Sequence, residues 1–372
     1  NNIALFSKHY LEKPEDSTVV KAIRIGIIVI LIILSANMMS FGVSSTNTGL
    51  EDIRVLLKGT IKNNGNNTIF INETDLLVFD YPLNTSTQKV RYIKAFVNDG
   101  EIPFYIEKYE NGYLLHINES SLAKKSIKPG EKVSSSIEYI VEINIGKRLL
   151  EIAGLSKSVA KNWSYIVINQ TEVNATSLWN YTNPLTSLLV KYIKYNKTIN
   201  RTPLELTLGL LEWFKRNIDY SSRVPPRQPF EVILDKKGDC DDMSNLLITI
   251  LRGSGIPSFL EIGIVYISKE FSTQASYANG LLRYKFIGGG AHGWVVAYIP
   301  PWGYIRIDLT FGGTNPISHI YLAAYYTYPT IVLSRIHGGD YTKESAQSIE
   351  SIVENKIEYD ILLVVEELEK QG

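Results

Sequence analysis

Cys240, the only cysteine among 372 residues, stands in the stretch GDCDDMSNLL at residues 238–247. A single cysteine cannot form a disulfide within the chain, so the thiol has some other use. Apolar residues then recur at helical spacing and predict a helix with one buried face; they are Met243, Leu246, Leu247, Ile250 and Leu251. Asp239 can cap this helix, which places Cys240 in its first turn. A helix N-terminus favours the thiolate, the nucleophilic form of cysteine.

Three aspartates beside the thiol, Asp239, Asp241 and Asp242, oppose this ionisation because their charges have the same sign. The thiolate therefore needs a cationic partner, and an imidazolium is the usual one. The best candidate is His292, which opens the strand HGWVVAYI between two glycines. The histidines show no metal-ligand spacing, so we expect neither a metal nor a cofactor; they are His9, His116, His292, His319 and His337.

Asp308, in the following strand, can orient the imidazole if the turn between the strands has the right length. A five-residue turn at 299–303 places Asp308 opposite Trp294 and diagonal to His292, about 7–8 Å away between Cα atoms. A four-residue turn without a bulge places them on opposite faces of the sheet. With the longer turn, Cys240 attacks an acyl carbon, His292 moves the proton and Asp308 fixes the ring. The backbone N–H of Cys240 can stabilise the oxyanion.

Taken one at a time, these residues have ordinary structural roles. A lone cysteine in a helix is commonly a small buried hydrophobe. A histidine that begins a strand is commonly structural, and an aspartate that ends one commonly belongs to a turn. The combination of the three, each in a suitable element, favours catalysis.

The combination resembles the transglutaminase-like superfamily of papain-type cysteine enzymes. The motifs of that family are a helix that opens with G-x-C and ends in L-R-x-x-G-I-P, an H-x-W strand and a strand ending in D-x-T. They match residues 238–240, 251–257, 292–294 and 308–310 in the same order. The similarity covers about residues 185–312. It implies that Cys240, His292 and Asp308 are the nucleophile, the base and the orienting acid.

This chain departs from the family pattern in one motif, where the commoner D-P-T is D-L-T. No side chain of the oxyanion hole can be assigned from the sequence. Tyr220 and Trp213 are neighbours of the motif only along the chain.

Composition excludes several classes of protein. Hydrophobic residues make up 45% of the chain, enough for a folded core. Thirty-eight basic and 38 acidic residues cancel, so nothing indicates a surface for nucleic acid.

Residues 25–43 form an apolar run without a charge, about 28 Å long as a helix, which is enough to span a bilayer. Lysines and an arginine precede the run, which predicts a cytoplasmic segment at 1–24 and everything after about residue 45 outside the cell. A cleaved signal peptide and a pilin-type leader cut near Lys21 are the alternatives. We therefore expect a single-pass protein of the cell membrane with an extracellular bulk.

Ten Asn-x-Ser/Thr sequons, against roughly four expected by chance, lie between residues 66 and 202. An Asn- and Thr-rich β region can produce sequons by accident, but the clustering agrees with the predicted topology. Glycosylation without disulfides is typical of an archaeal cell surface. The candidates are Asn66, Asn72, Asn84, Asn118, Asn162, Asn169, Asn174, Asn180, Asn196 and Asn200.

The predicted fold class is α+β. Short strands rich in Ile, Val, Tyr and Phe predict an extracellular β-sandwich at 50–150. A bridging segment rich in sequons follows at 151–184. Helical and then strand patterns at 185–335 predict a papain-like transglutaminase core, in which helices pack on an antiparallel sheet. A C-terminal segment at 336–372 packs on that domain as a helix or strand.

The most favoured function is hydrolysis of peptide or isopeptide amide bonds by a membrane-anchored enzyme. Acetyl-CoA is absent outside cells, which argues against arylamine acetylation, and the chain lacks the extra zinc cysteines of glycopeptide amidases. Lysine has a pKa of about 10.4, so an acidic exterior leaves little free amine and favours water as the acceptor. The alternatives are a protein-crosslinking transglutaminase and a non-enzymatic glycosylated scaffold. The expected partners are a protein or peptide substrate, the membrane and other cell-surface proteins.

Overall fold

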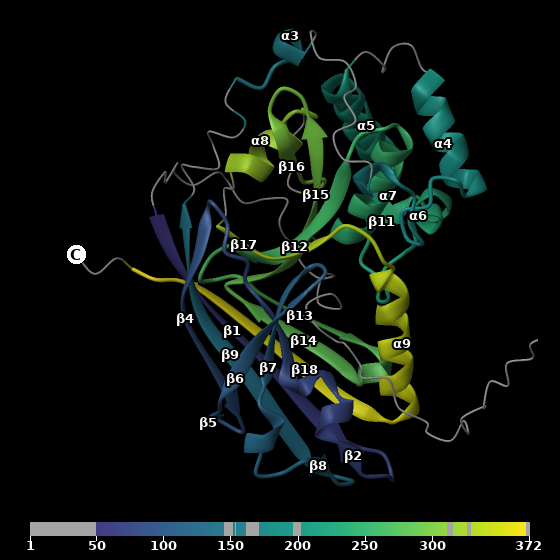
Figure 1. Cartoon of the computed structure of the whole chain (residues 1–372). Coiled ribbons are helices and arrows are strands. Elements are labelled where there is room, and N and C mark those ends of the chain that lie inside the picture. Colours follow the sequence, from purple (N-terminus) through teal and green to yellow (C-terminus); the bar gives the residue numbers. More distant parts are fainter. Residues whose placement is uncertain are drawn as a thin grey trace, which may run out of the picture.

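The computed structural model describes residues 50–144, 152, 154–160, 171–195, 202–310, 315–325 and 329–369. The predicted membrane span at 25–43 and the segment before it lie outside these residues. Within the described part, no helix is both long and apolar enough to cross a bilayer. The described residues form a mixed α+β fold with two large sheets and a group of helices (Figure 1).

The first sheet has seven strands in the order β13-β14-β18-β1-β9-β4-β5. Its strands are β1 (Leu50–Asn63), β4 (Gln88–Val97), β5 (Gly100–Glu101), β9 (Lys132–Asn144), β13 (Ser272–Tyr277), β14 (Leu282–Ile287) and β18 (Ile357–Glu367). All neighbours run antiparallel except β14 and β18. Side chains along β1 and β18 alternate between buried and less buried positions, so one face of this sheet is directed to the core.

The second sheet has the order β16-β15-β12-β17-β7-β3, with β6 also paired to β7. Its strands are β3 (Val78–Tyr81), β6 (Phe104–Tyr109), β7 (Gly112–Ile117), β12 (Ser258–Tyr266), β15 (Gly289–Ile299), β16 (Gly303–Ile307) and β17 (Thr330–Ile336). Every residue of β12 is buried, because this strand is covered on both faces. Helix α7 packs against β12 and β15, and β18 of the first sheet also contacts both strands. The second sheet is therefore the middle layer.

The longer helices cover one side of the second sheet and gather in the upper part of Figure 1, apart from α9, which lies beside the first sheet. The helices in the upper part are α4 (Pro184–Tyr195), α5 (Pro203–Asn217), α6 (Pro229–Asp235), α7 (Cys240–Gly253) and α8 (Ser318–Tyr325), with a short α3 (Lys157–Ala160) in the predicted bridging segment. Helix α9 comprises Tyr341–Glu354. Helix α5 begins with a regular N-terminal cap. Thr202 accepts a hydrogen bond from the N–H of Glu205, and Pro203 occupies the first turn.

The strands predicted at 50–150 are present, but they do not form a separate sandwich. Strand β1 pairs with β18 over eleven residue pairs, and β7 pairs with β17, so both large sheets combine strands from the two predicted domains. The predicted tail at 336–372 supplies α9 and β18, an inner strand of the first sheet. Periodicity identifies a strand and its buried face but carries no information about a partner 300 residues away, which is why the sandwich expectation was wrong.

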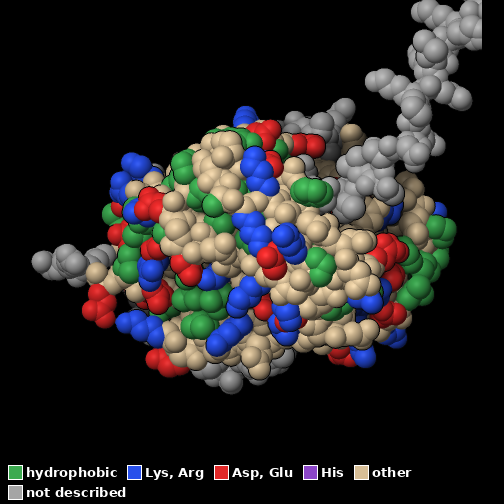
Figure 2. All heavy atoms as spheres, turned by 90° about the horizontal axis from the view of Figure 1, so that it is seen from below, with side chains coloured by type: hydrophobic (Ala, Val, Ile, Leu, Met, Phe, Trp, Pro, Cys, Tyr) green, Lys and Arg blue, Asp and Glu red, His purple; other side chains and the backbone are tan. Residues whose placement is uncertain are grey.

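The surface mixes charges of both signs. Arg54 bridges Glu138 and Glu366 across three strands of the first sheet, at 2.7 and 2.9 Å. Figure 2 shows the same mixture on the face seen from below, where basic and acidic side chains alternate with hydrophobic ones.

Candidate active site

The start of α7 presents Cys240 as the sequence predicts. Asp239 is the N-cap, and its carboxylate accepts a hydrogen bond from the N–H of Asp242 at 3.4 Å. Asp242 accepts one from the N–H of Asp239 in return, also at 3.4 Å, which completes a capping box. Cys240 is the first residue of the helix, and only 2% of it is exposed.

His292 lies within β15, directly opposite Gly263 of β12. A side chain at residue 263 would not fit, because its Cβ would lie 2.0 Å from the carbonyl oxygen of Ile331 and 2.8 Å from the ring of Trp294. The indole of Trp294 lies 5.8 Å from the imidazole between ring centroids. The glycine thus makes room for the packing that supports His292.

The predicted register between β15 and β16 is confirmed. Ile299 pairs with Gly303 and Val295 pairs with Ile307, so the register continues to place Asp308 opposite Trp294. The Nε2 atom of His292 lies 2.6 Å from Oδ2 of Asp308, and each side chain is only 1% exposed.

Thr310 binds the other oxygen of the same carboxylate. Its backbone N–H donates to Oδ1 of Asp308 at 2.9 Å, and its hydroxyl donates to that atom at 2.8 Å. Burial opposes ionisation of Asp308, but His292 and Thr310 outweigh it and lower the pKa of the carboxyl. The threonine of the D-x-T motif therefore holds the aspartate ionised and aligned.

His319, at the start of α8, holds the backbone of Asp308. Its carbonyl accepts the N–H of Asp308 at 3.1 Å, and its Nδ1 donates to the carbonyl of Asp308 at 2.8 Å. Burial lowers the pKa of His319, so a neutral ring makes this contact. The sequence marked His319 only as one of five scattered histidines.

The thiol of Cys240 lies beside β15, where the backbone N–H of Gly293 interacts with it. Burial raises the pKa of the thiol well above its ordinary value, and Asp241 and Asp239 raise it further. The opposition predicted from the aspartates is therefore present. The resting group is accordingly a thiol.

Three comparisons with known proteins found similar sequences and one similar fold. The family model for the transglutaminase-like superfamily matches residues 193–309, which include the positions of the thiol, the imidazole and the carboxylate. Residues 193–309 are therefore similar to the core of that superfamily. A stretch of 81 residues is 37% identical to YebA of Bacillus subtilis, a protein of uncharacterised function; it covers 22% of this chain and 10% of YebA.

One solved structure shares the overall fold. A candidate cysteine protease from Cytophaga hutchinsonii aligns with 87% of this chain and 93% of its own, at a TM-score of 0.51 and 13% identity. The periplasmic domain of TgpA from Pseudomonas aeruginosa aligns with 71% of this chain and 91% of its own, at a TM-score of 0.30 and 13% identity. The first similarity extends beyond the transglutaminase-like core into the strands at 50–144.

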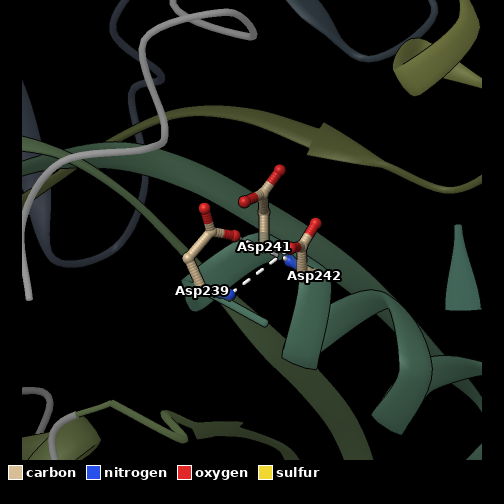
Figure 3. A group of neighbouring side chains, drawn as sticks. All are labelled: Asp239, Asp241 and Asp242. Atoms are coloured by element: carbon tan, nitrogen blue, oxygen red, sulfur yellow. Dashed lines mark hydrogen bonds between the residues drawn. The ribbon is translucent and has the colours of Figure 1, made fainter. Parts of the chain in front are cut away.

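Three buried carboxylates surround the start of α7 in the core, and Figure 3 shows them together. Oxygen atoms of Asp239, Asp241 and Asp242 lie within 4.8 Å of one another, close enough for a cation. Protein donors reach all three. The N–H of Arg223 donates to Asp239 at 3.3 Å, the hydroxyl of Tyr341 donates to Asp241 at 3.1 Å, and Arg227 binds Asp242.

Arg227 makes the strongest of these contacts. Its backbone N–H and its Nη1 reach the two oxygens of Asp242 at 2.6 and 2.8 Å. Burial and the charge of Asp241 nevertheless raise the pKa of Asp242 to about 7. The proline-rich loop that carries Arg227 is thereby fixed to the helix that carries the thiol.

A chain of hydrogen bonds connects α7 to α9. The indole N–H of Trp179 donates to Oδ1 of Asn245 at 3.0 Å, and the amide of Asn245 donates to the hydroxyl of Tyr341 at 2.5 Å. That hydroxyl is the donor to Asp241. Sequence reasoning missed Asn245 and Tyr341, because no local motif marks a contact between residues about a hundred positions apart.

Arg252 explains the L-R-x-x-G-I-P motif of the core. Its guanidinium donates to three backbone carbonyls, those of Ser258 at 2.8 Å, Asn174 at 3.1 Å and His337 at 3.0 Å. It also stacks over the ring of Trp179, 4.3 Å from the centroid. Arg252 thereby fixes the turn between α7 and β12. Strand β12 pairs with β15, the strand that carries His292.

Glu261 of β12 binds the indole that packs beside the imidazole. Its carboxylate accepts the indole N–H of Trp294 at 2.9 Å and binds Arg306 at 2.7 Å and Arg335 at 2.9 Å. Burial opposes its charge, but the arginines outweigh this and lower the pKa of Glu261 to about 2. In the sequence, Glu261 is the one charged residue of the apolar run LEIGIVYIS at 260–268. Its position there could have indicated a buried ion pair.

The remaining sequence candidates are placed as follows. Tyr220 pairs with Gly238, two residues before Cys240, whereas Trp213 packs edge-on against Phe214. Of the sequon asparagines, five are exposed and Asn118 is partly buried; the exposed ones are Asn66, Asn72, Asn84, Asn174 and Asn180. Four others lie outside the described residues: Asn162, Asn169, Asn196 and Asn200.

Proposed function

We propose that the chain is a cysteine hydrolase that cleaves peptide or isopeptide amide bonds by acyl transfer through Cys240, His292 and Asp308. The observation that carries the proposal is the 2.6 Å contact between Nε2 of His292 and Oδ2 of Asp308. It fixes the imidazole with its other nitrogen, Nδ1, as the atom that exchanges a proton with the thiol.

Acylation begins with a protonated thiol. As Sγ of Cys240 bonds to the carbonyl carbon, Nδ1 of His292 accepts the thiol proton, and the π pair of the carbonyl moves onto its oxygen. The C=O bond then re-forms and the C–N bond breaks. The amine leaves with the proton from His292, and Asp308 stabilises the imidazolium while it exists.

Water completes the reaction. His292 accepts a proton from water as its oxygen bonds to the thioester carbon, the C–S bond breaks, and the proton returns to sulfur. An amine in place of water would give a crosslink from the same thioester. Hydrolysis is favoured because an acidic exterior leaves lysine amines protonated.

We also propose the cellular setting that the sequence predicts. Residues 25–43 anchor the protein in the cell membrane, and the folded part is extracellular and glycosylated, as on an archaeal surface. The exposure of five sequon asparagines supports this setting. Intact-mass measurement of the native protein tests it, since each occupied site adds a glycan mass that Asn→Gln removes.

One experiment distinguishes the reactions. The full chain is incubated with unfolded casein and monodansylcadaverine, and mass spectrometry records new amino termini and incorporated amine. We expect new termini that disappear in Cys240→Ala and His292→Ala and persist in His116→Ala, a histidine on β7 stacked against Tyr105. Incorporation without cleavage would identify a crosslinking enzyme instead.

The burial of the thiol favours a second candidate. With 2% of Cys240 exposed, the domain in this state is also suited to a scaffold that binds without chemistry. A chain that neither cleaves casein nor incorporates amine, yet binds a surface protein, would support the scaffold.

A further inference from the structure

The backbone just before the proline-rich loop runs beside the start of α7. Strand β10 (Asp219–Tyr220) pairs in parallel with β11 (Lys237–Gly238), and Tyr220 lies opposite Gly238. The N–H of Asp219 donates to the carbonyl of Lys236 at 2.9 Å, and that of Ser221 donates to Gly238 at 3.0 Å. Tyr220 is thereby held next to the residues that lead into Cys240.

Side chains hold this segment further along. Nη1 of Arg227 donates both to the carbonyl of Ser221, at 2.9 Å, and to the carboxylate of Asp242, at 2.8 Å. The N–H of Arg223 donates to the N-cap aspartate, Asp239, at 3.3 Å. The strand pairing and these side-chain contacts together fix Tyr220 relative to α7. A group that acts on a reacting atom must be held in this way.

Among the buried side-chain polar atoms of residues 219–228, which the structure describes throughout, only the hydroxyl of Tyr220 lacks a hydrogen bond. Its oxygen is buried and has no hydrogen-bond partner among the described residues. Burial raises the pKa of the phenol, and ionisation of the neighbouring Cys240 or Asp239 would raise it further. A buried hydroxyl without a partner destabilises the fold, so its retention beside a nucleophile indicates a partner that arrives with the substrate.

We propose that Tyr220 is a catalytic residue, whose hydroxyl donates a hydrogen bond to the substrate carbonyl oxygen when Cys240 has added to the carbonyl carbon. This inference rests on the proposed acyl transfer. The bond from sulfur to carbon forms, the carbonyl π pair moves to oxygen, and the O–H of Tyr220 donates to that oxygen together with the backbone N–H of Cys240. The hydrogen bond ends when the C=O bond re-forms and the amine leaves.

The surroundings select a neutral donor for this position. Asp239 and Asp242 lie close by, but their carboxyl oxygens accept the N–H groups of the capping box, and Asp241 accepts the hydroxyl of Tyr341, so these oxygens are already engaged as acceptors. The phenol keeps its proton because its pKa is raised. The group that the sequence left unassigned in the oxyanion hole is thus supplied from β10.

The test compares Tyr220→Phe with Tyr277→Phe in the full chain. Tyr277 is a matched control, because it is also half-buried but its hydroxyl bonds to Ser222 of the same segment. Casein cleavage gives kcat and KM. Alkylation of Cys240 by iodoacetamide at high pH gives the reactivity of sulfur in a step that places no charge on an oxygen.

For Tyr220→Phe we expect kcat to fall about 100-fold or more, as for loss of one oxyanion donor, with KM and the alkylation rate nearly unchanged. The melting temperature should equal or exceed that of the wild type, which excludes a purely structural loss. Cleavage by Tyr220→Phe at the wild-type rate would overturn the role of Tyr220 alone. An equal fall in alkylation would also overturn it, since the hydroxyl would then act on the thiol. An inactive wild type would instead overturn the proposed hydrolysis, and this inference with it.

Discussion

Thr310 and His292 bind opposite oxygens of one buried carboxylate, that of Asp308. The threonine uses its hydroxyl and its N–H, and the histidine uses Nε2. Neither carboxylate oxygen can turn without losing a hydrogen bond, so the plane of the imidazole follows from the position of Thr310. This arrangement makes the threonine a positioning residue.

Replacing Thr310 with valine keeps the shape and the N–H but removes the hydroxyl. A hydrogen bond to a charged acceptor contributes about 1.5–3 kcal/mol, so kcat should fall about tenfold or somewhat more. Thr310→Ser should restore most of the rate, and the acid limb of the pH–rate profile should shift in the valine variant only. A valine variant with unchanged kcat and pH profile would show that Asp308 is held by other contacts.

Alkylation of Cys240 by iodoacetamide should be slow at neutral pH and should increase above pH 9. The reason is that burial, Asp241 and Asp239 raise the pKa of the thiol. Asp241→Asn should move the alkylation midpoint to lower pH, whereas Asp219→Asn, an exposed residue on β10, should not. Mass spectrometry of the single cysteine gives the rate directly. Fast alkylation of the wild type at pH 7 would contradict the burial of the thiol.

Glu261→Gln should destabilise the fold at pH 7. The pKa of Glu261 is about 2 in the folded protein against an ordinary value of 4.5, so its ionised form contributes on the order of 3 kcal/mol to stability. A lowered carboxyl pKa contributes above pH 4.5, and the contribution is lost as pH falls toward 2. Urea denaturation gives the free energy of unfolding of the wild type and of Glu261→Gln. The difference between the two values should become smaller as the pH falls from 4.5 toward 2. A constant difference would assign the effect to packing.

The contribution of Asp242 to stability should change with pH in the opposite direction to that of Glu261. Its pKa is raised from 3.8 to about 7, so the folded protein binds the proton more tightly than the unfolded chain does. The carboxyl therefore stabilises the fold most below pH 4, and this contribution declines as pH rises through 7. Asp242→Asn should flatten the slope of stability between pH 4 and 7. A slope that is unchanged in the variant would show that Arg227 keeps Asp242 ionised throughout.

Arg252→Lys should cost about 2–3 kcal/mol. A lysine cannot reach three carbonyls in the plane of a guanidinium, and it loses the stacking on Trp179. Arg216→Lys on the exposed face of α5 is the control and should change stability by less than about 0.5 kcal/mol. Equal losses of stability in the two variants would show that Arg252 does not stabilise the turn between α7 and β12. Chemical denaturation measures both.

The sequence predicted the local parts of the candidate site and missed the long-range ones. The start of α7, the capping role of Asp239 and the turn at 299–303 all depend on residues within a few positions of one another, so their spacing was sufficient. Tyr341 and Glu261 contribute through contacts across the fold. Their roles depend on which strands and helices meet, and that choice is made by packing of the whole core.

The order of strands in the sheets also depends on contacts that are distant along the chain. Alternating apolar residues identified β1 as a strand with one buried face. They could not indicate that β1 would have β18 on one side and β9 on the other, since several strands in the chain offer an equally apolar face.

Strand β18 is the last described element along the chain and lies inside the first sheet, between β1 and β14. A growing chain therefore exposes the unpaired edges of β1 and β14 until residue 367 has been synthesised, and any later unfolding of β18 exposes them again. Unpaired edges invite association between chains, so these steps are the ones at which a chaperone is needed. Proteolytic removal of the residues after 356 would return the finished protein to the same vulnerable condition.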